Sequence, residues 1–268
     1  MVREFQNKNY WALILGGSSG LGLATAKKLA NKFSLILCGR RQEKLTTLSK
    51  SLSNLTTVKT LTFDVRDKDD VSNKLNELEG EWKNIDILIN NAGNAHGMDF
   101  IHEGDIEDWD MMIDTNVKGL LYMTRLISPG MVKRRSGHII NICSTAGHEV
   151  YPNGNVYCAT KHAVAALTKG MRLDLTQYGI KVSQISPGAV EETEFALNRF
   201  DGDVEKALLA DPTKKAAPPE NPMSADRVKW EHIHRVFELC NRNVSETARR
   251  LKMHRRTLQR ILSKRSPR

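Results

Sequence analysis

This 268-residue sequence predicts an α/β fold with a parallel sheet, followed by a small helical domain. Short apolar runs alternate with amphipathic stretches over the first two thirds of the chain. The runs are apolar throughout rather than at every second residue, as in strands that are covered on both faces. The pattern changes at 211–225, a stretch with four prolines, after which only helical patterns occur. We therefore expect a doubly wound domain over 1–210, a linker over 211–225 and a helical domain over 226–268.

The apolar runs and amphipathic stretches are expected to form a Rossmann-type sheet with its helices. Strands are expected at 11–17, 34–40, 58–65, 85–93, 137–144 and 180–188. Helices are expected at 20–32, 42–52, 67–80, 105–132 and 155–178. Because each strand is followed by a helix, we expect the strands to run parallel, with helices on both faces of the sheet.

The positive charge of the chain is concentrated near its end. The formal net charge is +9, yet residues 1–210 contain 25 basic and 25 acidic side chains. Residues 211–268 contain the other 15 basic and 6 acidic side chains, and therefore the whole excess. This asymmetry separates two functional parts and predicts a polyanionic partner for the second.

Cysteine spacing and hydropathy exclude several classes of protein. Cys38, Cys143, Cys158 and Cys240 are scattered without a CxxC pair, so neither a disulfide framework nor a zinc site is expected. The first ten residues contain no apolar segment of a secretory signal, and no run of about 18 apolar residues occurs. We expect a cytoplasmic protein without a membrane partner or a metal.

A glycine-rich stretch, ILGGSSGLGLA at 14–24, follows the first expected strand. Gly16 allows a tight turn, and Gly20 and Gly22 let the backbone approach a pyrophosphate at the next helix N-terminus. An ordinary strand-to-helix turn is the alternative, but the strand–turn–helix context favours a dinucleotide site. The residues expected to bind the pyrophosphate are Gly16, Ser18, Ser19, Gly20, Leu21 and Gly22.

Two arginines, Arg40 and Arg41, follow the second expected strand. A carboxylate at this point would bind a free ribose 2′-hydroxyl and repel a 2′-phosphate, whereas guanidinium groups do the opposite. The sequence therefore favours NADP over NAD as the cofactor. The alternative is a solvated pair of charges at the start of a helix.

Tyr157 and Lys161 are four residues apart and therefore share one face of a helix. A free phenol titrates near pH 10, and a nearby ammonium is expected to stabilise the phenolate and lower that pKa. Tyr157 can then protonate a carbonyl oxygen, or accept the proton of an alcohol. Ser144, at the end of an expected strand, can bond to the same oxygen. Taken singly, each residue has a structural explanation, such as a half-buried tyrosine or a strand-end cap.

Residues from about 10 to 205 resemble the short-chain dehydrogenase/reductase family. The resemblance rests on GGSSGLG, NNAG (90–93), TNVKG (115–119), Ser144, YCATK (157–161) and ISPG (185–188), which occur in the family's order and spacing. GNVYCATK and SPGAVEETEF are most similar to the 3-hydroxy acid dehydrogenase branch, which includes serine 3-dehydrogenase-like enzymes. The resemblance implies NADP-dependent oxidation or reduction of a small 3-hydroxy acid or similar alcohol or carbonyl compound.

The resemblance also implies a role for each matching residue. Catalysis would fall to Asn116, Ser144, Tyr157 and Lys161, with Asn116 in a water-linked proton relay and Lys161 also on the nicotinamide ribose. Besides the residues above, the cofactor would contact Asp64, Val65, Asn91, Tyr157, Lys161, Pro187, Gly188 and Thr193.

Two positions depart from the family pattern. Leu15 replaces the usual threonine before Gly16, which removes a hydroxyl that often fixes the loop. The resemblance also stops after FDGDVEKALLA, where family members continue through further helices to a seventh strand. We therefore expect a sheet that ends at its sixth strand with an open edge, and a shortened cover over the substrate.

Residues 219–268 resemble the Fis-type helix-turn-helix output domain of redox-responsive bacterial response regulators. Helices are expected at 226–242, 245–252 and 255–264, with Ser245 as the cap of the second. The resemblance implies a DNA partner, and Arg, Gln and Thr side chains suit base edges and phosphates. The expected DNA-binding residues are Arg249, Arg250, Arg255, Arg256, Thr257, Gln259 and Arg260, with Lys252 and Lys264 also suited to phosphates. The alternatives are a solvated basic helix, or a polybasic tail that binds RNA or a membrane through charge alone.

Three hypotheses account for both parts of the chain. The first is an NADP-dependent oxidoreductase with an accessory DNA-binding domain. The second is a DNA-binding transcriptional regulator whose dehydrogenase-like domain senses NADP(H) without turnover. The third is a join of two unrelated genes, each part keeping its local chemistry. DNA binding by a unit of this size favours a homodimer or a higher homo-oligomer.

Overall fold

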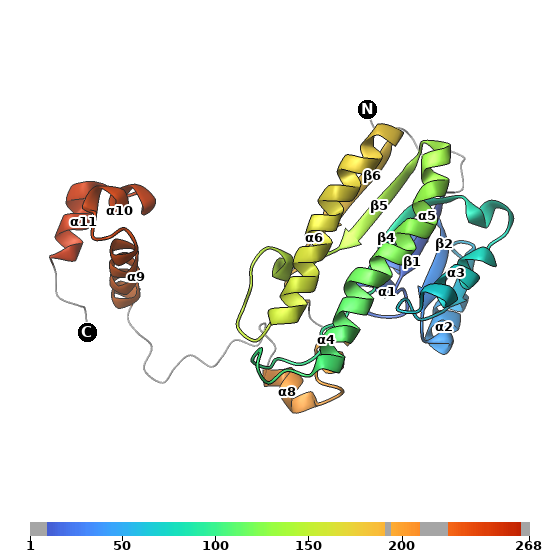
Figure 1. Cartoon of the computed structure of the whole chain (residues 1–268), viewed down its shortest axis with the longest axis horizontal. Coiled ribbons are helices and arrows are strands. Elements are labelled where there is room, and N and C mark those ends of the chain that lie inside the picture. Colours follow the sequence, from blue (N-terminus) through green and yellow to red (C-terminus); the bar gives the residue numbers. More distant parts are fainter. Residues whose placement is uncertain (1–9, 191–193, 210–224, 264–268) are drawn as a thin grey trace. The chain divides into compact units, whose positions relative to one another are not determined.

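A parallel sheet of six strands organises the first part of the molecule (Figure 1). The computed structural model describes residues 10–190, 194–209 and 225–263. The strands are β1 (Trp11–Leu15), β2 (Ser34–Gly39), β3 (Val58–Thr62), β4 (Ile85–Asn90), β5 (Gly137–Ile142) and β6 (Ile180–Ile185). Their order is β3-β2-β1-β4-β5-β6, and every neighbouring pair is parallel. The predicted Rossmann-type sheet of six strands is therefore confirmed.

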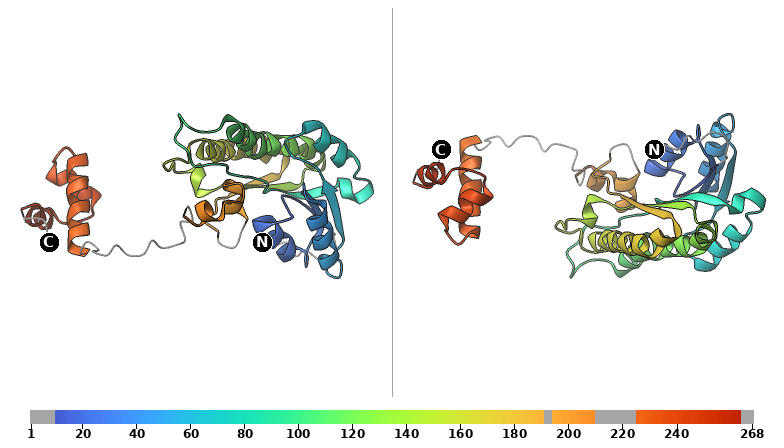
Figure 2. Two further views of the ribbon diagram at one scale, coloured as in Figure 1. Left: turned by 90° about the horizontal axis from the view of Figure 1, so that it is seen from below. Right: turned by 90° about the horizontal axis from the view of Figure 1, so that it is seen from above.

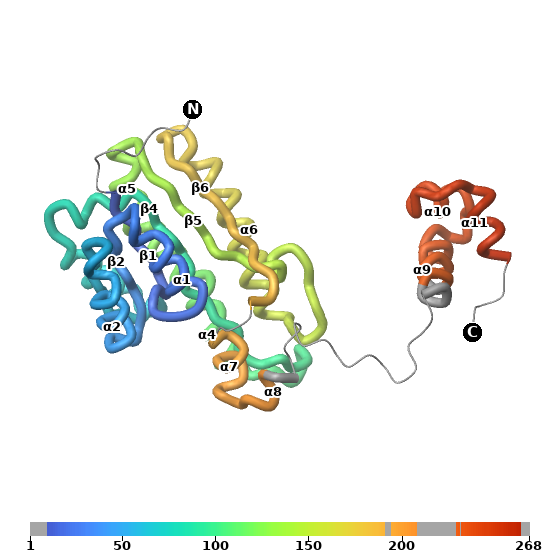
Figure 3. Tube along the Cα trace, turned by 180° about the vertical axis from the view of Figure 1, so that it is seen from behind, coloured from blue at the N-terminus to red at the C-terminus, as the bar shows by residue number. Residues whose placement is uncertain are grey.

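Helices of this part cover both faces of the sheet, and two short ones within 195–209 lie beyond the carboxyl ends of the strands (Figures 2 and 3). The helices are α1 (Gly20–Leu29), α2 (Gln42–Leu52), α3 (Lys68–Asn76), α4 (Ile106–Ile113), α5 (Leu120–Arg134), α6 (Asn155–Leu175), α7 (Phe195–Arg199) and α8 (Val204–Leu209). Short 3₁₀ segments occur at Gly80–Lys83, Thr145–Gly147 and Thr176–Tyr178. The single helix expected at 105–132 is α4 and α5 joined by a π-helical turn, Asp114–Gly119.

Alternate residues of each strand contribute to two apolar cores. In β1, Leu13 and Leu15 pack with α3, α5 and α6, whereas Ala12 and Ile14 pack with α1 and α2. Because both faces of the central strands are buried, their sequences are apolar throughout. The carboxyl ends of all six strands meet at one edge, where the connections after β1 and β4 leave toward opposite faces of the sheet.

The chain divides into two compact units, Met1–Thr213 and Lys214–Arg268. The second unit contains α9 (Ala225–Leu239), α10 (Val244–Arg250) and α11 (Arg255–Leu262). Ile233, Ala248 and Leu258, one from each helix, form its buried core. Thr193, Lys264 and nearly all of the expected linker lie outside the described residues.

The cap expected at Ser245 was wrong. Asn243 is the N-cap of α10, and its side-chain oxygen accepts hydrogen bonds from the N–H groups of Ser245 and Glu246, each at 3.1 Å. Asparagine is as good a cap as serine, and it stands two positions earlier. The helix therefore begins at Val244, and Ser245 lies in its first turn.

Among the described residues, no helix is long and apolar enough to cross a membrane. The same part of the chain contains no cluster of three or more His, Cys, Asp or Glu side chains that could hold a metal ion. All four cysteines are buried and free.

Candidate active site

The glycine-rich turn is fixed by backbone contacts to two neighbouring strands. Gly16 has a φ of +72°, and its N–H group and that of Gly17 donate to the Cys38 carbonyl at 2.9 and 3.1 Å. A Cβ atom at Gly22 would lie 2.1 Å from the Gly16 carbonyl oxygen, so only glycine allows α1 to begin this close to the turn. Leu15 lacks the hydroxyl of the family's usual threonine, but these backbone contacts fix the turn without it.

Asn91, expected to line the cofactor, lies beside this turn. Its side-chain amide donates to the carbonyls of Leu15 and Gly16 at 3.1 and 3.2 Å. The N-cap Ser19 makes no side-chain hydrogen bond to α1, and the first turn of α1 has no acidic residue. The first turn of α1 therefore contributes no carboxylate of its own that would repel a pyrophosphate at these backbone N–H groups.

Arg40 and Arg41 follow β2 at the carboxyl edge, and both side chains are exposed. Glu194 bonds to Arg41 at 2.7 Å and to Lys44 at 2.5 Å. The hydrogen bond from Lys44 and the one from Arg41 lower the pKa of Glu194. Lys44 was missed by sequence reasoning, although it lies one turn after Arg41 on α2 and so shares its face.

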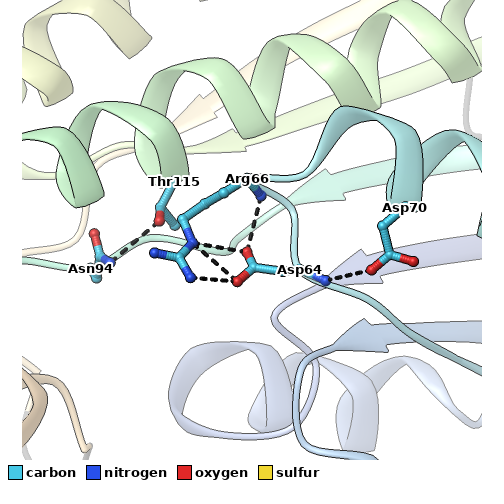
Figure 4. A network of polar contacts seen from close by, with 5 residues as sticks. All are labelled: Asp64, Arg66, Asp70, Asn94 and Thr115. Atoms are coloured by element: carbon cyan, nitrogen blue, oxygen red, sulfur yellow. Dashed lines mark hydrogen bonds and ion pairs between the residues drawn. The ribbon is translucent and has the colours of Figure 1, made fainter.

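Asp64 and Val65 follow β3, where the resemblance implied a place beside the adenine (Figure 4). Arg66, also missed, donates from Nε and Nη2 to Asp64 at 3.0 and 2.7 Å. Burial acts to raise the pKa of Asp64, but the hydrogen bonds and the charge of Arg66 outweigh it and the pKa is lowered. Val65 is buried against Gly119 of the π turn.

Asn116 lies inside the π turn and is buried. Its Oδ1 accepts from the Asn94 N–H at 2.9 Å, and its Nδ2 donates to the Asn94 carbonyl at 2.9 Å and to Thr160 Oγ1 at 3.0 Å. A Cβ atom at Gly93 would lie 3.2 Å from both Asn116 Oδ1 and Lys161 Nζ. The side chains of Asn116 and Lys161 therefore both lie close to Gly93, which follows β4.

Tyr157 and Lys161 lie on one face of α6, and Ser144 follows β5. The Lys161 Nζ atom is 5.8 Å from the centre of the Tyr157 ring and donates to the Ile142 carbonyl at 3.2 Å. Ser144 caps a short 3₁₀ turn, and its side chain acts to lower the pKa of Tyr157. Pro187, after β6, accepts a hydrogen bond from the Thr145 N–H at 3.0 Å. Three of the four expected catalytic side chains thus converge, with Asn116 adjoining Lys161.

The expected effect of Lys161 on the Tyr157 phenol was wrong for the chain without its cofactor. Burial raises the pKa of Tyr157 to about 12, against the opposing effects of the Ser144 hydrogen bond and the Arg199 charge. Burial also lowers the pKa of Lys161 to about 8. Desolvation disfavours the charged forms of both groups, and Lys161 is not among the groups that lower the pKa of Tyr157.

A pocket beside Tyr157 contains residues that the motifs did not indicate. It is lined by His96, Gly97, Asp99, Asp105, Asp108, Trp109, Met112, Asn153, Gly154, Asn155, Tyr157 and Arg199. Arg199 comes from α7, about 40 residues beyond Tyr157, where no local pattern distinguishes it from a surface arginine. Gly188 has open space around its α-carbon, as a segment close to a ligand requires.

Comparisons with known proteins agree with this geometry. A family model described as "short chain dehydrogenase" matches residues 10–203. The chain is 44% identical over 210 residues to the NADP-dependent 3-hydroxy acid dehydrogenase YdfG of Escherichia coli (strain K12), covering 78% of this chain and 84% of that protein. It is 40% identical over 205 residues to sulfoacetaldehyde reductase 2 of Chromohalobacter salexigens, covering 75% and 81%. A solved structure of serine dehydrogenase in closed form with NADP⁺ has 44% identity and a TM-score of 0.72, covering 77% and 83%.

Proposed function

The chain belongs to the short-chain dehydrogenase family and is an NADP-dependent oxidoreductase acting on CH–OH groups, and we propose that its substrate is a small 3-hydroxy acid. The observation that carries the proposal is the placement of Tyr157 and Lys161 one helical turn apart beside Ser144. The relatives named for 3-hydroxy acids and serine support the substrate class.

The residues of the carboxyl edge fit NADP. The pyrophosphate would lie against the turn from Gly16 to Gly22 and the start of α1. The exposed guanidinium groups of Arg40 and Arg41 suit a 2′-phosphate, which would replace Glu194 as the partner of Arg41. The pair of Asp64 and Arg66 would flank the adenine, and Lys161 would bond to the nicotinamide ribose.

Tyr157 and Ser144 are the groups that act on the substrate oxygen. The cofactor, when bound, supplies or accepts the hydride at the carbon. In reduction, the Tyr157 hydroxyl donates its proton to the substrate oxygen while Ser144 donates a hydrogen bond to it. In oxidation, the phenolate of Tyr157 accepts the proton of the alcohol and returns to the phenol. The Arg199 guanidinium favours the phenolate that remains after reduction or precedes oxidation.

The test of this proposal follows the absorbance of reduced nicotinamide with NADP⁺ and a panel of 3-hydroxy acids. Turnover is expected, and Tyr157→Phe should lower kcat by about 10²- to 10⁴-fold, the usual contribution of general acid–base catalysis. Turnover that survives in Tyr157→Phe would contradict the mechanism. Cofactor binding without turnover of any substrate would favour a sensor instead.

We propose a second function, DNA binding, for the second unit. Three helices with a core of their own form the arrangement that a helix-turn-helix needs, and α10 and α11 are joined by the four residues from Leu251 to His254. Arg255, Arg256, Gln259 and Arg260 are exposed on α11, while Leu258 faces the core. The Fis-type resemblance of 219–268 and the net positive charge of 211–268 support this proposal.

The candidate DNA contacts fall into two groups. Arg249 and Arg250 on α10 both pair with Glu246, at 2.5 and 3.2 Å, which reduces the charge they offer to a phosphate. Arg255, Arg256 and Arg260 make no ion pair within the described part of the unit, and Thr257 is half-buried. Base and phosphate contacts should therefore depend most on α11. A homodimer would present two such helices to one duplex.

Retention on duplex DNA, measured over a range of salt concentrations, tests this second function. Arg256→Ala should weaken binding and, if the side chain contacts a phosphate, reduce the salt slope by about one. Arg235→Ala, an exposed arginine on α9, is the matched control and should change neither. Equal losses in the two variants, or equal retention on RNA or anionic vesicles, would indicate attraction by charge alone.

A further inference from the structure

The pocket beside Tyr157 has one basic and several acidic residues. Arg199 and Tyr157 line the same pocket, together with His96, Asp105 and Asp108. The central carbon of the Arg199 guanidinium lies 5.8 Å from the centre of the Tyr157 ring. A cation thus stands next to the phenol that handles the substrate oxygen, on the substrate side of the site.

The Arg199 side chain is held in place without a carboxylate partner. Its Nε donates to the Gly97 carbonyl at 2.9 Å, and its Nη1 donates to the Tyr151 hydroxyl at 3.1 Å. A guanidinium has five N–H donors, so these two bonds leave others for a ligand. No carboxylate within the described residues of the first unit forms an ion pair with it. A half-buried cation of this kind offers a charge-assisted bidentate site to an anion.

Two of the acidic residues of the pocket have partners other than Arg199. Asp105 caps α4 by accepting a hydrogen bond from the Glu107 N–H at 2.8 Å. Asp108 lies 3.7 Å from the Nδ1 atom of His96, and burial raises the pKa of its carboxyl group. Asp99 also lines the pocket, and carboxylate oxygens of Asp99 and Asp108 lie near Gly97, whose carbonyl Arg199 contacts. The guanidinium can therefore balance one negative charge of a ligand, and the carboxylates around it would repel a second.

We infer that Arg199 binds the carboxylate of the 3-hydroxy acid whose hydroxyl is held by Tyr157 and Ser144. This inference rests on the proposed function and adds the residue that recognises the acid. Two carbon–carbon bonds separate the carboxylate carbon of such a substrate from its hydroxyl-bearing carbon, a short span that matches the close approach of Arg199 to the Tyr157 ring. Phe195, 5.8 Å from Tyr157 between ring centres, is an apolar neighbour of the same phenol.

The carboxylates around Arg199 narrow the substrate class further. A monocarboxylic acid whose remaining substituent is neutral or cationic brings one negative charge, which Arg199 can balance. A 3-hydroxy dicarboxylate would bring a second carboxylate among Asp99, Asp105 and Asp108 and should be a poor substrate. The site should thus select for a single negative charge, two carbon–carbon bonds from the reacting carbon.

Arg199 also has a structural contact that the experiment must separate from substrate binding. Its own carbonyl accepts a hydrogen bond from the Gly97 N–H at 2.9 Å, so α7 and the loop after β4 are joined at this residue. Loss of the side chain could therefore disturb α7 itself. A purely structural effect would lower turnover of charged and uncharged substrates alike.

The experiment compares a 3-hydroxy acid with its uncharged methyl ester as substrates of the full chain with NADP⁺. The native chain should prefer the acid, and Arg199→Met should lower kcat/KM for the acid about 10- to 100-fold, mainly through KM, with the ester changed less than about threefold. Arg199→Lys should restore part of the preference because it keeps the charge. Arg125→Met, an exposed arginine on α5, is the control and should leave both substrates unchanged.

The outcomes separate this inference from the proposed function. A native chain that oxidises uncharged alcohols but no 3-hydroxy acid would overturn the proposed substrate class, and the inference with it. A native chain that prefers the acid, with the preference intact in Arg199→Met, would overturn only the inference. Equal losses on acid and ester in Arg199→Met, not rescued by Arg199→Lys, would assign the residue to the support of α7.

Discussion

Burial shifts the pKa values of Tyr157 and Lys161 toward their neutral forms. The phenol, 7% exposed, is protonated at all moderate pH values in the chain without cofactor, and the amine, 5% exposed, loses its proton near pH 8. The amine nevertheless keeps a hydrogen bond to the Ile142 carbonyl. The two groups are thus held in position at an energetic cost, as catalytic groups often are.

The Lys161→Met variant should show how the energetic cost of burying the Lys161 amine depends on pH. Between about 8 and 10.5 the unfolded chain holds the lysine proton and the folded chain does not, so the free energy of unfolding contributed by Lys161 rises with pH in this window. The methionine variant has no such group and should be the more stable protein below pH 8, by up to a few kcal/mol. The difference should shrink as the pH approaches 10.

Chemical denaturation at pH 7 and pH 9.5, followed by far-ultraviolet circular dichroism, measures this difference. Lys169→Met, an exposed lysine on the same helix, is the control and should show no pH-dependent gap from the native chain. If the difference in the free energy of unfolding between Lys161→Met and the native chain is the same at both pH values, the Lys161 amine does not lose its proton in this range.

At the scale of elements, the residues just before α7 connect the cofactor side of the site to the substrate side. Glu194 immediately precedes α7 and bonds to Arg41 and Lys44 near the start of α2, whereas Arg199 ends α7 beside Tyr157. A 2′-phosphate at Arg41 would compete with Glu194 for the same cations. We therefore expect cofactor binding and the position of α7 to be coupled through the Glu194 carboxylate.

Glu194→Gln should strengthen NADP⁺ binding by about two- to fivefold, because removal of an exposed ion pair frees Arg41 and Lys44 for the phosphate. Binding of NAD⁺, which lacks that phosphate, should not change. Fluorescence titration with both cofactors measures the effect, with Glu205→Gln on α8 as the control. Equal changes for the two cofactors would show that Glu194 does not compete with the phosphate.

Local sequence patterns predicted the strands and the glycine turn, but they did not predict contacts between residues far apart in the sequence. The six strands and the glycine turn could be predicted because apolar runs and glycines are set by residues close in sequence. Arg41 and Glu194 are 153 residues apart, and Arg199 and Gly97 are 102 apart, so no local pattern announces either contact. The π turn around Asn116 was missed because its sequence continues the helical periodicity on both sides.

On the scale of the whole molecule, charge is divided between the two units. The first 210 residues are balanced, and the excess of basic side chains falls in 211–268. A polyanion should therefore bind the second unit and leave the neutral first unit free for its cofactor and substrate. DNA retention of the full chain, measured with NADP⁺ and with NADPH, tests whether the oxidation state of the cofactor influences DNA binding.

The sheet of the first unit ends at β6, which pairs with β5 alone among the described strands. Arg172 of α6 donates from Nε to the Val182 carbonyl of β6 at 3.1 Å, and Lys181 of the same strand is exposed. Arg172→Ala should free that carbonyl and promote self-association at high protein concentration, measurable by light scattering, whereas Lys169→Ala should remain unchanged. Monodisperse Arg172→Ala would show that the carbonyl is protected in another way.

One guanidinium from the neighbouring helix thus occupies one carbonyl on this flank of the sheet. With that acceptor taken, an incoming strand from a second copy would find one ladder position already filled. A homologue that lost the arginine would need a substitute charge, a proline or a covering partner at this flank to stay dispersed.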